Sequence, residues 1–160
     1  MHRVGHFGAA LLLYAPVGAV LTAGGDPTLA LVGFAVAAAL STLPDADEHL
    51  TIEHRGPTHT VWFVIGVALL AALSGTLAGL VLARPVAFGT TVGGAAAISL
   101  SSHLLADSIT PMGIRPFAPA SSFHHSFELT LAANPRANAA FFLAGTVAAL
   151  ASQTVAVVLP

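Results

Sequence analysis

The chain has 160 residues, of which 56% are hydrophobic and 8% are charged, whereas an average soluble domain carries about 25% charged residues. Five basic and seven acidic side chains cannot cover the surface of a soluble domain of this length, so the composition predicts a single integral membrane domain over residues 1–160. The net charge of −2 argues against nucleic-acid binding, and the lack of cysteine excludes disulfides, thiolate nucleophiles and Cys–zinc sites.

Five apolar stretches predict five helices. A membrane span needs about 20 residues, so the last three stretches are long enough, and the first two form a tilted pair or a helical hairpin. Two pairs of small residues, Gly75 with Gly79 and Gly89 with Gly93, would let the third and fourth helices approach closely. The expected fold is an all-α bundle of about five transmembrane helices, at 7–23, 28–43, 60–83, 86–106 and 137–159.

The order of the spans predicts the orientation of the chain. Five spans place the N-terminus and the connections 44–59 and 107–136 on one side of the membrane. Four of the five arginines fall on that side, and Arg84 falls alone on the other. Because positive charge accumulates on the cytoplasmic side, we expect a multi-pass protein of the cell (inner) membrane with this polar side in the cytoplasm.

The histidines sort by the same division. All eight lie on the side with the four arginines, and so does every acidic residue except Asp26. Solvation of independent loops does not explain four separate segments that deliver histidine and carboxylate to one side. These groups are ligands for zinc, manganese or iron, so the pattern predicts a metal site.

Three segments supply the strongest candidate ligands. His103 and Asp107 are four residues apart and would share one face of a helix. Pro44 ends the second apolar stretch and frees the backbone to turn Asp45 inward. The stretch 54–59 reads as a turn with Thr58 as the helix N-cap, which would place His59 in the first helical turn.

Simpler interpretations exist for each group taken alone. A histidine at a membrane interface is commonly a solvated side chain, and a His–Asp pair on a helix is commonly a structural hydrogen bond. Asp45 and Asp47 could be a solvated helix cap. The sequence assigns no role to His2, His49, His54 and His125.

The motifs resemble the YdjM-like family of small inner-membrane proteins, described as predicted metal-dependent hydrolases. The stretches LPDAD at 43–47, HRGPTHT at 54–60, HLLAD at 103–107 and TPMG at 110–113 carry the resemblance, of which HRGPTH is the most specific. The order of ligands is also similar to that of zinc-dependent phospholipase C. That order can be matched here by His6, Asp45, His59, His103 with Asp107, and His124 with Glu128.

The resemblance implies a metal-dependent hydrolase that acts on an amphiphilic phosphoester, such as a phospholipid, at the level of the headgroups. We expect one or two divalent ions, zinc or else manganese or iron, and such an ion lowers the pKa of a bound water to about 7. Asp47 is expected to act as a base or to orient a ligating histidine, and Arg55 to hold a phosphate oxygen. The expected metal ligands are His6, Asp45, His59, His103, Asp107, His124 and Glu128.

Two other functions, a metal transporter or sensor and a structural metal site, could use the same residues. A metal transporter should carry ionisable residues near the middle of its spans, and none of the five stretches does. A structural metal site that staples the bundle should be closed by protein ligands, whereas a catalytic site keeps an open position. The sequence leaves this choice open, and it does not indicate the oligomeric state.

Overall fold

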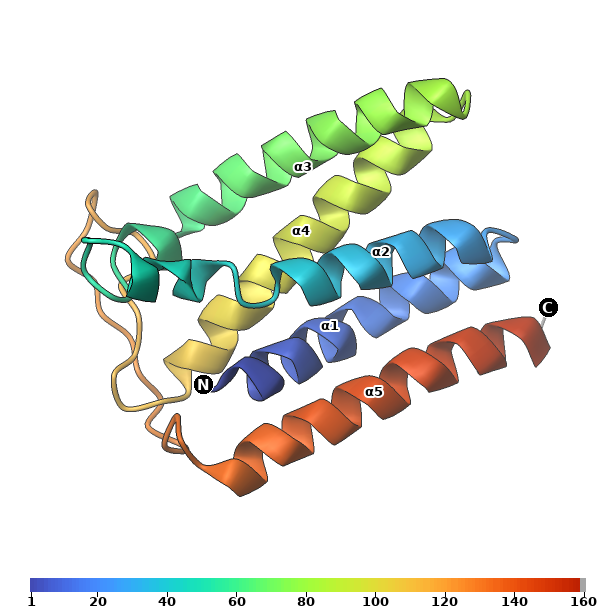
Figure 1. The fold of residues 1–160 in the computed structure, drawn as a ribbon. Coiled ribbons are helices and arrows are strands. Elements are labelled where there is room, and N and C mark those ends of the chain that lie inside the picture. The colour runs from blue at the N-terminus through green and yellow to red at the C-terminus, as the bar shows by residue number, and fades with distance from the viewer. Residues whose placement is uncertain (159–160) are drawn as a thin grey trace.

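The computed structural model describes residues 1–158, and the side chains of residues 1–154. The fold is all-helical, as predicted, with five α-helices in the order shown in Figure 1. Two short 3-10 helices, η1 and η2, lie in the connection between the second and third α-helices. The α-helices are α1 (Arg3–Ala23), α2 (Pro27–Leu40), α3 (Val61–Val81), α4 (Pro85–Ser108) and α5 (Pro135–Val158), and the 3-10 helices are η1 (Pro44–His49) and η2 (Pro57–His59).

The helix boundaries follow from local capping. The Asp26 side chain accepts a hydrogen bond from the backbone N–H of Leu29, and Pro27 occupies the first position of α2. Asn134 caps α5 in the same way, and Pro135 begins that helix. The first helix begins earlier than predicted, at Arg3, so its 21 residues are long enough to span a membrane.

The start of α3 corrects one prediction. The N-cap is Thr60, whose hydroxyl accepts a hydrogen bond from the N–H of Phe63, and not Thr58. His59 therefore lies in η2 and not in the first turn of α3. The three residues of η2 form a separate 3-10 turn before the helix, and His59 at its end is buried in the bundle.

Helices α1 and α4 form the centre of the bundle. Helix α1 packs against α2, α4 and α5, and α4 packs against α1, α2 and α3. The predicted close approach of α3 and α4 is confirmed, because a Cβ atom added to Gly75 would lie 2.7 Å from the Phe88 carbonyl oxygen of the neighbouring helix. Figure 1 shows the connections between α2 and α3 and between α4 and α5 at the same end of the bundle as the N-terminus.

Three segments of the described chain are long and apolar enough to cross a membrane: Arg3–Ala23, Pro27–His49 and Val61–Val81. The second of these comprises α2 and η1. Helices α4 and α5 have 24 residues each but are less apolar. In the second half of α4, Ser99, Ser102, His103 and Asp107 are buried, whereas Ser101 is exposed.

Candidate metal centre

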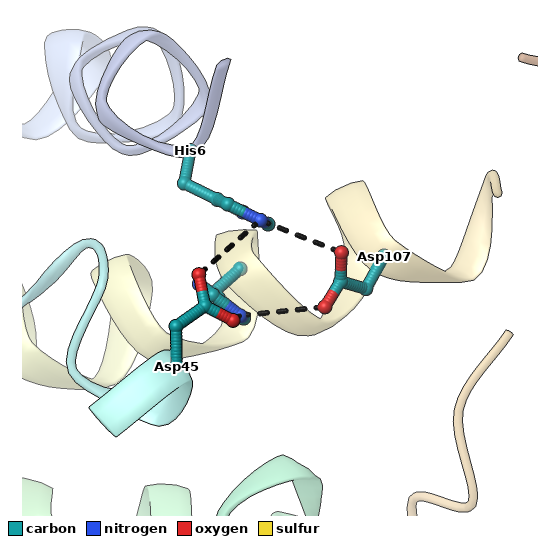
Figure 2. A group of neighbouring side chains, drawn as sticks. His6, Asp45 and Asp107 are labelled. Carbon is teal, nitrogen blue, oxygen red and sulfur yellow. Dashed lines mark ion pairs between the residues drawn. The ribbon is translucent and has the colours of Figure 1, made fainter. Parts of the chain in front are cut away.

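Four elements bring histidine and aspartate together at the end of the bundle that carries the long connections. His6 lies on α1, Asp45 on η1, His59 on η2, and His103 with Asp107 on α4. Figure 2 shows His6, Asp45 and Asp107 pointing toward one another from three of these elements. The three histidines and Asp107 are buried, and the Asp45 side chain is 13% exposed.

Two imidazoles and two carboxylates converge on one point. The Nε2 atoms of His59 and His103 are 3.1 Å apart. Asp45 Oδ1 lies 3.6 Å from His59 Nε2 and 3.3 Å from His103 Nε2. Asp107 Oδ2 lies 3.3 Å and 3.4 Å from the same two nitrogens. These five distances show that four possible ligand atoms, two imidazole nitrogens and two carboxylate oxygens, lie close together.

The remaining oxygen of each carboxylate faces His6. Its Nε2 lies 3.4 Å from Asp107 Oδ1 and 3.9 Å from Asp45 Oδ2. The His6 ring also stacks on the His103 ring, with centroids 3.7 Å apart. One suitable ligand atom from each of His6, Asp45, His103 and Asp107 lies within 4.8 Å of the others. Asp45 and Asp107 thus stand between His6 on one side and the His59–His103 pair on the other.

Hydrogen bonds to the far side of each ring orient two of these histidines. His103 Nδ1 donates to the backbone carbonyl of Ser41 at 2.8 Å, which leaves the Nε2 lone pair directed into the cluster. His59 Nδ1 lies 3.0 Å from the hydroxyl of Thr58, which in turn donates to Asp47 Oδ2 at 2.9 Å. Both rings are therefore held in the orientation that a metal ligand requires.

Asp47 organises the chain that carries His59. Its carboxylate is buried and also accepts hydrogen bonds from the His54 ring and from the backbone N–H of Arg55, each at 2.9 Å. Asp47 Oδ2 lies 3.4 Å from His59 Nδ1 on the side of the ring that faces away from the cluster. Of the two roles expected for Asp47, these contacts support orientation of a ligating histidine.

Arg55 is tied to the cluster through Asp107. Its Nη2 donates to Asp107 Oδ1 at 2.8 Å, and its Nη1 donates to the Thr110 hydroxyl and the Gly113 carbonyl at 3.0 Å each. The backbone of Arg55 has φ of 59°, a left-handed conformation that a non-glycine residue seldom adopts. Arg55 also lines a polar pocket of about 90 Å³. A substrate that contacts Arg55, as expected from the sequence, would therefore lie in that pocket.

The structure does not bring His124 and Glu128 to the cluster. His124 is exposed, and its Nε2 hydrogen bonds with the Met112 carbonyl at 2.9 Å. Glu128 is exposed and has φ of 52°. A spacing of four residues unites two side chains on a helix, but this segment is irregular, so the spacing does not pair them.

Three contributors to the site carry no sequence signal that identifies them. The Ser41 carbonyl is a backbone group, and any residue at that position could provide it. Thr58 looks like a helix cap in the sequence. The third is the α-amino group of Met1, which hydrogen bonds with Asp107 Oδ1.

The chain matches a known family of membrane proteins. The model of the YdjM inner membrane protein family matches residues 1–159. The chain belongs to this family. The family is named for the inner membrane, which confirms the predicted membrane location and the resemblance found in the motifs. No curated protein and no solved structure matches the chain.

The cluster contains buried charge that must be compensated. Asp107 is paired with the Arg55 guanidinium and with the α-amino group of Met1, whereas Asp45 faces three histidine rings. Burial lowers the pKa of His59, but its hydrogen bonds with Asp107 and Asp45 outweigh this effect and raise the pKa above its ordinary value. Among the described residues, His6 Nδ1, His6 Nε2 and Asp107 Oδ2 are buried without a hydrogen-bond partner. A metal ion bound between His59, His103 and Asp45 would give Asp107 Oδ2 a partner.

The donor distances also fit a metal. Zinc binds histidine and carboxylate ligands at about 2.0–2.2 Å in tetrahedral geometry, which implies donor atoms roughly 3.3–3.6 Å apart. The five printed distances among His59 Nε2, His103 Nε2, Asp45 Oδ1 and Asp107 Oδ2 range from 3.1 to 3.6 Å. The residues therefore form a group that could hold a divalent metal ion.

Proposed function

We propose that the chain is a membrane-embedded, metal-dependent hydrolase that cleaves an amphiphilic phosphoester, such as a phospholipid, at the level of the headgroups. The observation that most supports this proposal is the cluster of four donor atoms with near-tetrahedral spacing, buried at one end of a membrane bundle. Zinc fits the donors best, and manganese and iron accept the same ligand types.

His59, His103, Asp45 and Asp107 would hold the principal ion. His6 Nε2 and Asp45 Oδ2 offer donors for a second ion beside it, and Asp107 Oδ1, which also accepts hydrogen bonds from Arg55 and from the α-amino group of Met1, would be the third. A divalent ion in such a site acts as a Lewis acid and lowers the pKa of water to about 7, so that a nucleophile forms at neutral pH.

The remaining polar residues position the ligands. Asp47 and Thr58 orient His59 through a hydrogen bond at its Nδ1 atom, and the Ser41 carbonyl orients His103 in the same way. Arg55 holds Asp107 and presents the rest of its guanidinium to the adjoining polar pocket. An arginine at this position suits a phosphate oxygen, because its planar fork donates two parallel hydrogen bonds.

A structural metal site is the second candidate, and one observation favours it. The principal group already supplies four protein donors, which closes the coordination of a tetrahedral zinc ion. The His6 group supplies three donors, which leaves a position for water or substrate. A single bound ion would therefore support a staple, and two ions would support a hydrolase.

The decisive experiment measures metal content of the detergent-purified protein by elemental analysis. We expect two equivalents of divalent metal in the wild type and a loss of at least one in His59→Ala and in Asp107→Ala. His49→Ala is the matched control, because His49 is exposed and lies in the same polar region without touching the cluster. It should keep the wild-type content.

Activity is then tested with a panel of phosphomonoesters and phosphodiesters that carry alkyl chains. Turnover that requires the metal and is lost in Asp107→Ala would support the hydrolase. If the wild type binds no metal when zinc or manganese is supplied, the cluster is a hydrogen-bond network and the proposal fails. One tightly held ion without turnover on any ester would instead favour the structural site.

A further inference from the structure

An apolar groove lies beside the metal centre on the same end of the bundle. It encloses about 630 Å³, within the range of roughly 300–1,000 Å³ that small-molecule sites occupy. Helices α3 and α4 form two of its walls, and the connection between α4 and α5 forms the third. Representative lining residues are Val64 and Ile65 from α3, Leu104 and Leu105 from α4, and Phe117 and Phe123 from the connection.

The groove adjoins the polar pocket that contains Arg55. Ile114 lines both cavities. Its backbone pairs with that of His125 through two hydrogen bonds of 3.0 Å, so the partition between the cavities is fixed in place. Leu104 and Ser108, which line the groove, directly follow the cluster residues His103 and Asp107 on α4. The groove and the metal cluster therefore occupy neighbouring faces of the same helical turns.

The polar pocket suits an anionic group. Arg55 and Arg115 line it together with His54 and His124, against the single carboxylate of Glu53. The Arg55 side chain is 9% exposed, and its Nε atom is buried without a hydrogen-bond partner among the residues described. A buried donor of this kind is costly unless a ligand accepts its hydrogen bond.

We infer that the apolar groove binds the alkyl chain of an anionic amphiphile whose phosphate group occupies the adjoining polar pocket. This inference rests on the proposed function and specifies its substrate as a phosphoester with a lipid chain.

The position of the groove identifies its occupant. The outer face of α3 exposes large apolar side chains, including Leu69, Leu73 and Leu77, along the length that would face the bilayer. The groove begins on this helix, and Phe117, Phe123 and Phe127 extend its apolar wall along the connection. A chain that enters from the bilayer can thus follow one apolar surface up to the polar pocket.

The test compares alkylphosphonates of increasing chain length, from methyl to octyl, which hydrolysis cannot consume. Binding to the purified protein in lipid nanodiscs is measured by calorimetry, and partitioning into empty nanodiscs is subtracted. Each methylene that enters the groove should strengthen binding by up to about fourfold, since burial of one CH₂ group contributes about 0.8 kcal/mol. We therefore expect the wild-type affinity to rise with chain length.

Ser101→Trp places a large ring in the groove, because Ser101 is exposed and lines it. Ser74→Trp is the matched control, at an exposed serine of α3 whose hydroxyl bonds only to its own helix. We expect Ser101→Trp to weaken octylphosphonate binding at least tenfold and to leave methylphosphonate binding unchanged. Ser74→Trp should behave as the wild type. If Ser101→Trp does not fold, Ile65→Trp obstructs the same groove from α3.

The outcomes separate this inference from the proposed function. Equal octylphosphonate affinity in Ser101→Trp and Ser74→Trp, or a wild-type affinity independent of chain length, would overturn the groove as a chain site. Metal-dependent hydrolysis could still stand in that case. Conversely, if the protein binds no metal but its affinity still rises with chain length, the groove stands as a chain site and the proposed hydrolase function fails.

Discussion

The Thr58 hydroxyl connects Asp47 to the ring of His59. Its hydroxyl donates to Asp47 and accepts from the His59 ring, at 2.9 and 3.0 Å. We expect Thr58→Val to weaken metal affinity by roughly 10–100-fold without changing the number of ions bound, because loss of such outer hydrogen bonds leaves the ligand present but poorly oriented. Competition with a chelator of known affinity measures the effect.

A second threonine provides the control for that experiment. Thr90 is exposed, and its hydroxyl bonds only to carbonyl groups of its own helix. Thr90→Val should therefore retain the wild-type affinity. If Thr58→Val also retains it, then the orientation of His59 does not depend on the Asp47–Thr58 pair, and Asp47 has some other role.

Single residues could be predicted where their chemistry is distinctive. Asp45, His59, His103 and Asp107 were expected as ligands from their residue types and their common side of the membrane. His6, His124 and Glu128 were added by the ligand order of the proteins that the motifs resemble, yet neither this order nor the right side of the membrane brings a side chain to the cluster. That requires the path of an irregular connection, which residue types do not determine.

The α3–α4 pair depends on glycine at the contact between the two helices. A Cβ atom at Gly75 would lie 2.7 Å from the Phe88 carbonyl oxygen, which belongs to the backbone of α4 and cannot move without shifting that helix. We expect Gly75→Ala to destabilise the protein by about 1–3 kcal/mol, the usual cost of overpacking. Unfolding in mixed detergent micelles measures the change.

Gly66 lies on the same helix with nothing within 4 Å of its added Cβ atom, so it isolates the effect of packing. Gly66→Ala should be neutral or stabilising by up to about 1 kcal/mol, because alanine favours the helix. Equal destabilisation by both substitutions would show that the loss of glycine matters for a reason other than the approach of α4.

Helices were predictable from apolar runs, and their ends less so. Proline and asparagine fixed the start of α5, because both residues have strong positional preferences at a helix N-terminus. The start of α3 was misplaced because Thr58 and Thr60 are chemically equivalent as caps. Only the folded position of Asp47, which draws Thr58 away from the helix, distinguishes them.

An ion pair joins two turns at the end of the bundle away from the metal centre. Asp26, which caps α2, pairs with Arg84, which precedes α4. The hydrogen bond with Arg84 lowers the pKa of Asp26, so the pair contributes stability above the unfolded pKa of about 3.8 and loses it as the pH falls through the lower folded value. Asp26→Asn keeps the cap and removes the charge.

We expect Asp26→Asn to lower the melting temperature slightly at pH 7, because exposed ion pairs contribute little. The difference from the wild type should shrink below pH 3.8 and vanish when Asp26 is protonated. Melting curves of both proteins across this pH range test the prediction. A difference that is constant with pH would assign the effect to the cap instead of the charge.

The orientation of the whole bundle follows from the distribution of its arginines. Arg3, Arg55, Arg115 and Arg136 belong to the end that holds the metal centre, and Arg84 belongs to the other. The positive-inside rule therefore predicts that the candidate metal centre faces the cytoplasm. Because the chain has no cysteine, single cysteines introduced at the two ends report the orientation without background labelling.

Glu48→Cys marks the end with the metal centre, and Thr28→Cys marks the opposite end, since both positions are exposed. With a membrane-impermeant maleimide, we expect Thr28→Cys to react in intact spheroplasts and Glu48→Cys to react only after the membrane is permeabilised. The reverse pattern would place the metal centre in the periplasm. The proposed ions would then come from the periplasm and the proposed amphiphile from the outer leaflet.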